Sequence, residues 1–178
     1  FEHLAYDFCY SDINNVMRLL ENHDSDRFLL ETPSSLDAYK QAVVLLLTIP
    51  GIPQLYYGQE LLMTGTTKID FGYIRPDMSG GWKEEAFGFM KKLLHWRKGN
   101  DVISKGKMKH FMPRNNIYVY ERSYNGKSIL VVMNGVNKEV DWDLAHYKEV
   151  IGNKTDARNV LTDTDVKLGA IIRLQPKE

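Results

Sequence analysis

The chain has 178 residues, with 23 Lys and Arg, 23 Asp and Glu, and a formal net charge of zero. Hydrophobic residues make up 43% and charged residues 26%, a composition typical of a globular protein, which excludes a disordered tail. The balanced charge also excludes a nucleic-acid binder that depends on bulk positive charge. The single cysteine, Cys9, excludes an internal disulfide and any metal site built from several thiolates.

The sequence predicts neither a membrane span nor a signal peptide. No apolar run approaches the ~20 residues that a membrane span requires, so no span is expected. The chain opens at Phe1 without a start methionine or a signal peptide, and we interpret it as a piece of a longer protein. Its localisation therefore stays open.

The pattern of apolar residues changes near residue 100. Before that point the apolar segments are continuous or have helical period, and after it short alternating segments are separated by Asn and Gly. This change predicts an α/β part over residues 1–100 and an all-β part over residues 101–178.

The first part alternates strands and helices. The expected elements, in order, are a strand over Asn15–Leu20, a helix over Asp37–Thr48, a strand over Gln54–Tyr57 and an amphipathic helix over Lys83–Arg97. Ser34 is the candidate N-cap of the first helix. This order is typical of a parallel sheet, in which ligands bind at the carboxyl ends of the strands. The polar residues 21–27 and the Gln59-Glu60 pair both follow a predicted strand.

The second part consists of short strands. Asn125-Gly126 is a hairpin turn that favours positive φ at both positions. We expect an antiparallel β-sandwich with no catalytic cluster. The predicted strands are Gly106–Phe111, Ile117–Ser123, Ser128–Met133, Glu139–Trp142, Tyr147–Ile151, Asn159–Thr162 and Ala170–Leu174.

His23-Asp24 is the strongest local signal for a site. A carboxylate beside an imidazole can bind neighbouring hydroxyls of a sugar ring, one accepting and the other donating hydrogen bonds. In the alternative interpretation both residues cap the next helix or pair with Arg27. We expect Asp26 to form a salt bridge with Arg27, and the orientation of Glu21 stays open.

Other candidates have simpler explanations. The acid/base pair of a hydrolase could come from Glu21, Asp24, Asp26 and Glu60. Metal ligation is disfavoured, because His23 is the only nearby histidine and no metal-binding spacing exists. Tyr56 and Tyr57 could stack on a sugar, but tyrosines within a strand are more often packing residues, and Trp96 is expected to pack in the core. Trp82 is a candidate for ligand contact, and Cys9 is expected to be a buried, inert thiol.

Two segments together resemble a known family. Leu20-Glu21-Asn22-His23-Asp24-Ser25-Asp26-Arg27-Phe28 and Ile49-Pro50-Gly51-Ile52-Pro53-Gln54-Leu55-Tyr56-Tyr57-Gly58-Gln59-Glu60 are similar to the fourth conserved region and the eighth strand of α-amylase-family glycoside hydrolases. The resemblance is closest to the neopullulanase and cyclomaltodextrinase branch. It implies the last two β/α units of a TIM (β/α)8 barrel, followed by an antiparallel β-sandwich C-terminal domain.

The resemblance also implies roles for individual residues. Asp24 corresponds to the third catalytic carboxylate, and His23 would hydrogen-bond the same sugar in the transition state. An α-glucan oligosaccharide is the implied partner, and no cofactor is expected in this part of the protein, although the family often carries structural calcium elsewhere in its barrel. The implied substrate-binding residues are Asn22, Arg27, Arg75 and Asp77. Gln59 departs from the acidic residue that the family often has before Glu60.

The family's nucleophilic aspartate and general-acid glutamate lie on earlier strands that have no counterpart here. A retaining hydrolase needs two carboxyl groups about 5–5.5 Å apart, so we expect the isolated chain to be inactive. The segment between Phe8 and Asn15 is also shorter than in the family. In the alternative hypothesis the chain is a non-catalytic module that binds α-glucans or self-associates through open strand edges.

Overall fold

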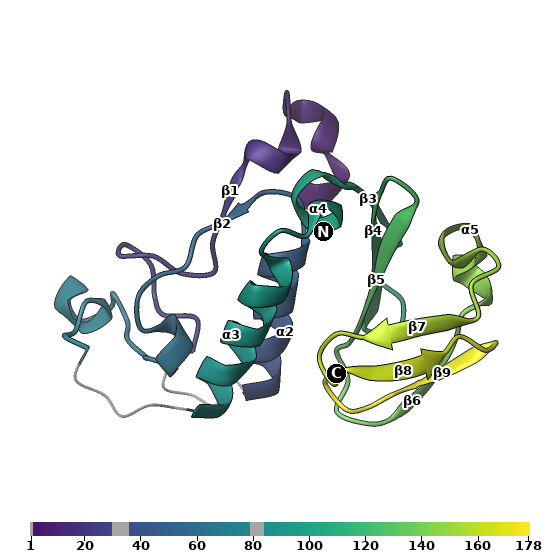
Figure 1. The fold of residues 1–178 in the computed structure, drawn as a ribbon. Helices are drawn as coiled ribbons and strands as arrows, with labels where there is room; N and C mark the ends of the chain where they lie inside the picture. The colour runs from purple at the N-terminus through teal and green to yellow at the C-terminus, as the bar shows by residue number, and fades with distance from the viewer. Residues whose placement is uncertain (1, 30–35, 79–83) are drawn as a thin grey trace. The chain divides into compact units, whose positions relative to one another are not determined.

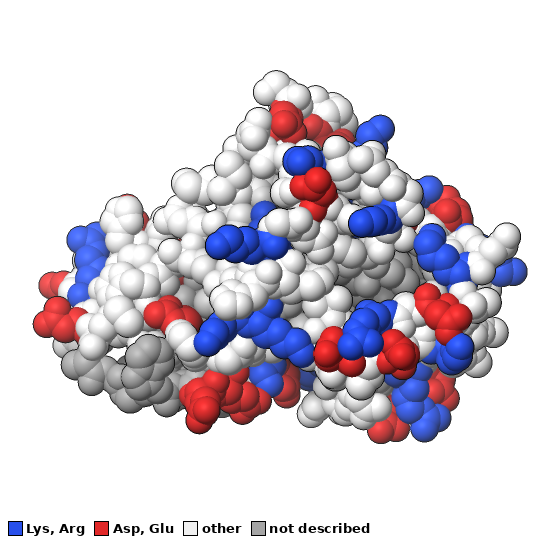
Figure 2. Space-filling view, viewed as in Figure 1, with Lys and Arg blue, Asp and Glu red and all other residues white. Residues whose placement is uncertain are grey.

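The computed structural model describes residues 2–29, 36–78 and 84–178. The chain divides into two compact units, the first ending at Lys107 and the second running from Met108 to Glu178. Each unit has its own hydrophobic core. Both signs of charge occur on the visible face of each unit (Figure 2), as the net charge of zero suggests. None of the helices among the described residues is long and apolar enough to cross a membrane.

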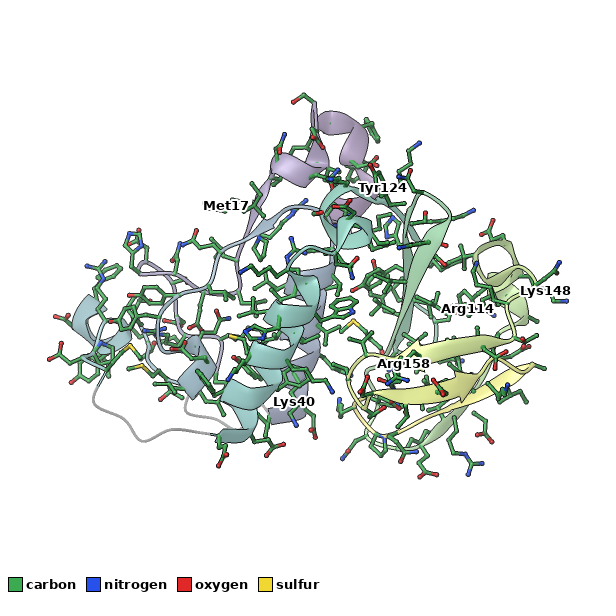
Figure 3. The ribbon with its side chains drawn as sticks, in the orientation of Figure 1. Met17, Lys40, Arg114, Tyr124, Lys148 and Arg158 are labelled. Carbon is green, nitrogen blue, oxygen red and sulfur yellow. The ribbon has the colours of Figure 1, made fainter. Side chains whose placement is uncertain are left out.

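Two helices form the centre of the first unit. Helix α2 (Leu36–Thr48) and helix α3 (Glu84–Arg97) lie side by side (Figure 1), close to the helices predicted over these segments. Lys40, labelled in Figure 3, joins them through an ion pair of 2.6 Å with Glu85. The apolar residues recur at helical spacing and interlock across the pair. They are Tyr39, Val43 and Leu47 on α2 and Ala86, Met90 and Leu93 on α3.

Each of these helices follows one strand of a short parallel ladder. Strand β1 (Met17–Arg18) pairs with β2 (Ile52–Pro53), and the backbone N–H of Gln54 donates to the carbonyl of Arg18 at 2.7 Å. Both strands are shorter than predicted, and β2 lies before the predicted Gln54–Tyr57 segment rather than over it. Pro53 has no N–H for a further partner strand, so the ladder is narrow and ends where the chain turns into the loop that follows.

The start of the chain is built from short turns. Helix α1 (Glu2–Ala5) is followed by 3₁₀ turns over Asp7–Cys9 and Ile13–Asn15. Cys9 is exposed, so the expectation of a buried thiol is wrong. The reason is local, because no residue of the Asp7–Cys9 turn is buried against the core.

The segment after β2 also runs through short turns instead of a long strand. It contains 3₁₀ turns over Gln59–Leu61 and Phe71–Ile74. Gly58 enters the first of these turns with a positive φ of 80°, a conformation that glycine adopts without steric cost. Helix α4 (Asp101–Lys105), which the sequence analysis did not predict, is capped by the Asn100 side chain.

The second unit contains three antiparallel strand pairs among the described residues. Strands β3 (Lys107–His110), β4 (Ile117–Tyr124) and β5 (Lys127–Asn134) form one sheet. Strand β6 (Val140–Asp143) pairs with β9 (Ile171–Leu174), and β7 (Asp156–Asn159) pairs with β8 (Thr164–Lys167). The turn between β4 and β5 has positive φ at Asn125 and Gly126, as predicted. The core residues are Ile117, Val119, Leu144, Tyr147, Val150 and Leu174.

Two predicted strands of this unit are wrong. The segment predicted as Tyr147–Ile151 forms helix α5 (Lys148–Ile151) after a 3₁₀ turn. Its core residues Tyr147 and Val150 are three apart, which is helical spacing. The segment predicted as Asn159–Thr162 keeps only Asn159, the last residue of β7, in a strand, and residues 160–162 belong to the turn between β7 and β8. The Asn159 side chain there accepts hydrogen bonds from the backbone N–H groups of Leu161 and Thr162, an arrangement that competes with a sheet ladder.

Gly51 provides a test of the ladder. Its φ is 125°, and a Cβ there would lie 2.5 Å from the carbonyl oxygen of Val16. We expect Gly51→Ala to lower the free energy of unfolding of the first unit by about 1–3 kcal/mol. The matched control is Gly88→Ala in α3, where a Cβ has nothing within 4 Å and should stabilise the helix by about 0.5–1 kcal/mol. Urea unfolding followed by circular dichroism measures both changes, and equal stability of the two variants would contradict the tight approach at Gly51.

Candidate active site

The loop after β1 is a polar turn held by its own hydrogen bonds, and the side chains of His23 and Asp24 project from it. The Asn22 side-chain oxygen accepts a hydrogen bond from the backbone N–H of Asp24 at 2.9 Å, and the Ser25 hydroxyl accepts one from the backbone N–H of Asn22 at 3.0 Å. These bonds satisfy the backbone inside the turn. The side chains of His23 and Asp24 are consequently 60% and 61% exposed.

His23, Asp24 and Arg75 form one cluster on the surface of the first unit. His23 Nε2 lies 3.1 Å from Asp24 Oδ2, and Arg75 Nη2 donates to Asp24 Oδ1 at 3.0 Å. Arg75 Nε also donates to the His23 carbonyl at 2.9 Å. Asp24 therefore pairs with Arg75, and the alternative in which it pairs with Arg27 is wrong. An exposed ion pair adds little stability, so the main effect of these contacts is to fix the orientation of the carboxylate.

A buried ion pair lies beneath this cluster. Arg27 Nη1 donates to Glu21 Oε1 at 2.8 Å and to the Tyr57 carbonyl at 2.7 Å, and Arg27 Nε donates to the Ile74 carbonyl at 3.1 Å. Glu21 Oε2 accepts from the backbone N–H of Phe28 at 2.6 Å. The two side chains are 0% and 2% exposed. The pair thus joins the loop after β1 to two segments that follow β2.

This arrangement changes two expectations from the sequence. The predicted salt bridge between Asp26 and Arg27 is wrong, because Asp26 faces Thr67 and accepts from its backbone N–H at 2.5 Å and from its hydroxyl at 2.9 Å. These hydrogen bonds hold the pKa of Asp26 below its usual range. Arg27, which the sequence analysis named as a substrate contact, has its guanidinium inside the unit. A sugar at the surface would meet Asp24 and Arg75 before Arg27.

Within the pair Gln59-Glu60, Gln59 supports the interior, and Glu60 is half-buried. Gln59 is buried, and its carbonyl accepts a hydrogen bond from the Tyr39 hydroxyl at 2.7 Å. Burial raises the pKa of Tyr39. Of the carboxylates considered for an acid/base pair, Glu21 and Asp26 are already engaged in structural contacts, and Asp24 is the one that projects beside an imidazole. The described residues contain no group of three or more His, Cys, Asp or Glu that could hold a metal ion.

The remaining candidates lie in different parts of the chain. Asp77 is exposed two residues after Arg75, and Trp96 packs against the helical core. Trp82 and Ser34 lie outside the described residues. Arg75 is predicted from the sequence only through the family resemblance, because no local pattern links it to Asp24, 51 residues away.

A hollow of about 410 Å³ lies at the other end of the ladder. It is lined by residues that precede β1, by Gly51 and the two residues of β2, and by Arg97 and the end of α4. In parallel α/β folds the amino ends of strands serve stability, and sites form at the carboxyl ends. His23, Asp24 and Arg75 all follow the strands, so we place the candidate site there.

Comparisons with known proteins cover nearly the whole chain. The family profile for the α-amylase catalytic domain matches residues 5–116, and the profile for the cyclo-malto-dextrinase C-terminal domain matches residues 108–178. A cyclomaltodextrinase from Thermoanaerobacter pseudethanolicus is 32% identical over 92% of this chain and 28% of its own length. A cyclomaltodextrin glucanotransferase from Niallia circulans is 30% identical over 85% of this chain and 22% of its own length. The chain thus spans less than a third of these relatives.

The fold agrees with that of solved structures. An α-amylase from Geobacillus thermoleovorans, solved with acarbose, has a TM-score of 0.86 over 99% of this chain and 40% of its own, at 22% identity. A maltogenic α-amylase from Thermotoga neapolitana has a TM-score of 0.79 over 99% of this chain and 43% of its own, at 24% identity.

The buried ion pair generates a stability prediction. Glu21→Gln keeps the size of the side chain but leaves the buried guanidinium of Arg27 without a counter-charge, which should cost about 3–5 kcal/mol in the free energy of unfolding. Urea unfolding measures this loss. As a control, Asp101→Asn removes the exposed pair with Lys105, whose side chains are 54% and 58% exposed, and should change stability by less than about 1 kcal/mol.

A double variant separates the ion pair from general packing damage. Glu21→Leu with Arg27→Met replaces both charges by apolar groups. The double variant should therefore lose less stability than the sum of the losses of Glu21→Leu alone and Arg27→Met alone. If the losses add, or if Glu21→Gln costs no more than Asp101→Asn, the pair does not join the three segments as described.

Proposed function

The chain belongs to the α-amylase family of glycoside hydrolases, and from that premise we propose that it is the C-terminal part of a retaining hydrolase of α-glucans. Residues 1–100 would supply the last two β/α units of the (β/α)8 barrel, and residues 101–178 the C-terminal β-sandwich. The order β1, α2, β2, α3 and the parallel pairing of β1 with β2 support this assignment. So does the antiparallel pairing in the second unit.

The proposed role of the surface cluster is to stabilise a transition state. Asp24 would accept hydrogen bonds from hydroxyls of the sugar before the cleaved bond, and His23 would donate to the same sugar. Such contacts strengthen as the ring flattens toward an oxocarbenium ion, so they raise the rate rather than only the affinity. The observation that carries the proposal is the exposed His23–Asp24 pair, 3.1 Å apart and held by Arg75.

Neighbouring residues would assist in different ways. Asn22 fixes the turn that carries the pair, through its hydrogen bond to the backbone of Asp24. Asp77 would contact a more distant sugar unit beside Arg75. Arg27 would act as a positioning residue, because its contacts are with the protein interior. The nucleophile and the general acid would come from earlier barrel strands, so the isolated chain would bind a sugar without cleaving it.

Titration of the chain with maltotriose tests this function. We expect chemical-shift changes at residues 21–25 and 75–77 at millimolar sugar, and no release of reducing ends above background. Asp24→Asn and His23→Ala should each weaken binding by roughly tenfold, or about 1.4 kcal/mol. Asp101→Asn, an exposed carboxylate outside the cluster, is the control and should bind as the wild type does. Cleavage by the chain, or full binding by Asp24→Asn, would contradict the proposal.

A second candidate function is self-association through the open side of the parallel ladder. Met17 and Ile52 are register partners that are 61% and 56% exposed, and Leu19 and Leu55 are exposed nearby. Leu20 packs against the helical core, so the alternate residues of this segment face away from it. Figure 3 shows Met17 on β1, beyond the ends of the two helices. Exposed apolar strand faces of this kind favour association with another chain.

Sedimentation velocity over a range of concentrations tests this candidate. The wild-type chain should shift toward dimers or larger species as its concentration rises, whereas Met17→Glu with Ile52→Lys should stay monomeric. Met112→Glu, a residue of the second unit that is 71% exposed, serves as the control and should not prevent association. A wild-type chain that stays monomeric at high concentration would remove this function.

A further inference from the structure

The loop that follows β2 and carries Arg75 has a fixed course. The Gly65 carbonyl accepts a hydrogen bond from the backbone N–H of Arg27 at 3.0 Å, and Thr67 donates to Asp26 from both its backbone and its hydroxyl. Farther along, Ile74 is 0% exposed and its carbonyl accepts from Arg27. The loop is therefore attached to the buried ion pair at two places.

The two arms of this loop also touch each other. A Cβ at Gly65 would lie 2.2 Å from the Tyr73 carbonyl oxygen, so only glycine permits this approach. At the far end of the loop the Tyr57 hydroxyl donates to the Pro76 carbonyl at 2.9 Å. Between these attachments, the Asp70 side chain accepts from the backbone N–H of Gly72 and caps the 3₁₀ turn Phe71–Ile74.

Large apolar side chains project from this fixed loop into solvent. Phe71 is 49% exposed, Tyr73 is 56% exposed and Ile69 is 70% exposed. A group of exposed apolar side chains on an anchored backbone is typical of a binding surface, because it gains nothing from the core and loses little entropy when a ligand covers it.

One aromatic residue of this surface, Phe71, is continuous with the candidate active site, and Tyr73 lies two residues farther along the same 3₁₀ turn. The Arg75 guanidinium lies 5.4 Å from the centre of the Phe71 ring, and the same guanidinium donates to Asp24. One side chain therefore separates the ring from the carboxylate. A pyranose has apolar C–H faces and a rim of hydroxyls, so a chain of such units suits a surface on which a ring adjoins a fixed carboxylate.

We propose that Phe71 and Tyr73 form an aromatic platform that stacks on a glucosyl unit next to the one bound at Asp24. The platform makes the chain prefer longer α-glucans over short ones. This inference rests on the proposed function, because it takes the sugar at Asp24 as its starting point. It assigns substrate length preference to Phe71 and Tyr73, whereas Asp24 and His23 bind a single sugar unit.

The dissociation constants for methyl α-glucoside, which has a single glucosyl unit, and for maltoheptaose, both measured by NMR titration, test the platform. The wild-type chain should bind maltoheptaose more tightly than methyl α-glucoside. Phe71→Ala with Tyr73→Ala should weaken maltoheptaose binding by roughly tenfold, the loss of about one stacked ring pair, and leave the binding of methyl α-glucoside unchanged. Tyr73→Phe keeps a ring and should retain the preference, whereas Phe71→Leu with Tyr73→Leu keeps the apolar character without flat rings and should lose it.

Phe8→Ala is the matched control, because Phe8 is an aromatic side chain of the same unit that is 75% exposed and lies in the Asp7–Cys9 turn. It should bind both sugars as the wild type does. Urea unfolding of each variant checks that the fold is intact, and equal midpoints are expected because the replaced side chains lie outside the core.

The failure of the platform and the failure of the proposed function give different results. Equal affinity for both sugars, or a preference that survives the double alanine variant, overturns the platform and leaves the role of Asp24 standing. Binding of maltoheptaose that needs the two rings but not Asp24 supports the platform and overturns the role of Asp24. Absence of binding to either sugar overturns both. Resonances of Phe71 and Tyr73 that respond to protein concentration but not to sugar overturn the platform in favour of a protein contact.

Discussion

The ion pair between Glu21 and Arg27 is the interaction on which the first unit depends. Removing two charges from water is costly, and their attraction offsets this cost only when further hydrogen bonds satisfy both groups. Here the guanidinium also donates to the carbonyls of Tyr57 and Ile74, and the carboxylate accepts from a backbone N–H. Nη2, the remaining nitrogen of Arg27, has no hydrogen-bond acceptor among the residues that the structure describes, but the guanidinium carbon lies 4.1 Å from the centre of the Tyr56 ring. The aromatic face takes the place of a polar partner.

The buried pair contributes stability, and the exposed cluster is the part proposed to function. Desolvation makes the buried pair strong but inaccessible, whereas Asp24, His23 and Arg75 are accessible and gain little from one another in water. Both share the same two segments, because Arg27 lies three residues after Asp24 in the chain and holds the carbonyl of the residue before Arg75. The position of the exposed cluster therefore derives from the buried pair. This arrangement supports the proposal of a site whose accuracy comes from the layer beneath it.

The sequence predicted what local periodicity determines and missed what tertiary contacts determine. Helices α2 and α3 were predicted to within a residue, because a long apolar stripe at 3.6-residue spacing has few alternatives. The short apolar run Tyr147–Ile151 suits a strand or a helix equally, and packing in the core decided for a helix. The partners of Asp26 and Arg27 were also missed, because Thr67 and the carbonyl of Ile74 lie far along the chain. The roles of His23 and Asp24 stay predictions, with exposure and geometry in their favour.

The relation between the two layers also distinguishes a binding site from a stabilising cluster. If His23, Asp24 and Arg75 served stability, their loss would weaken the fold about as much as the loss of other tertiary contacts. An exposed cluster contributes about 0–1 kcal/mol, far less than the several kcal/mol at risk in the buried pair. Damage to Glu21 would then displace Asp24, whereas damage to Asp24 would leave Glu21 and the fold in place. Such one-way dependence is expected where the fold supports a side chain that acts on something outside the protein, and a sugar held by hydrogen bonds from one face suits that geometry.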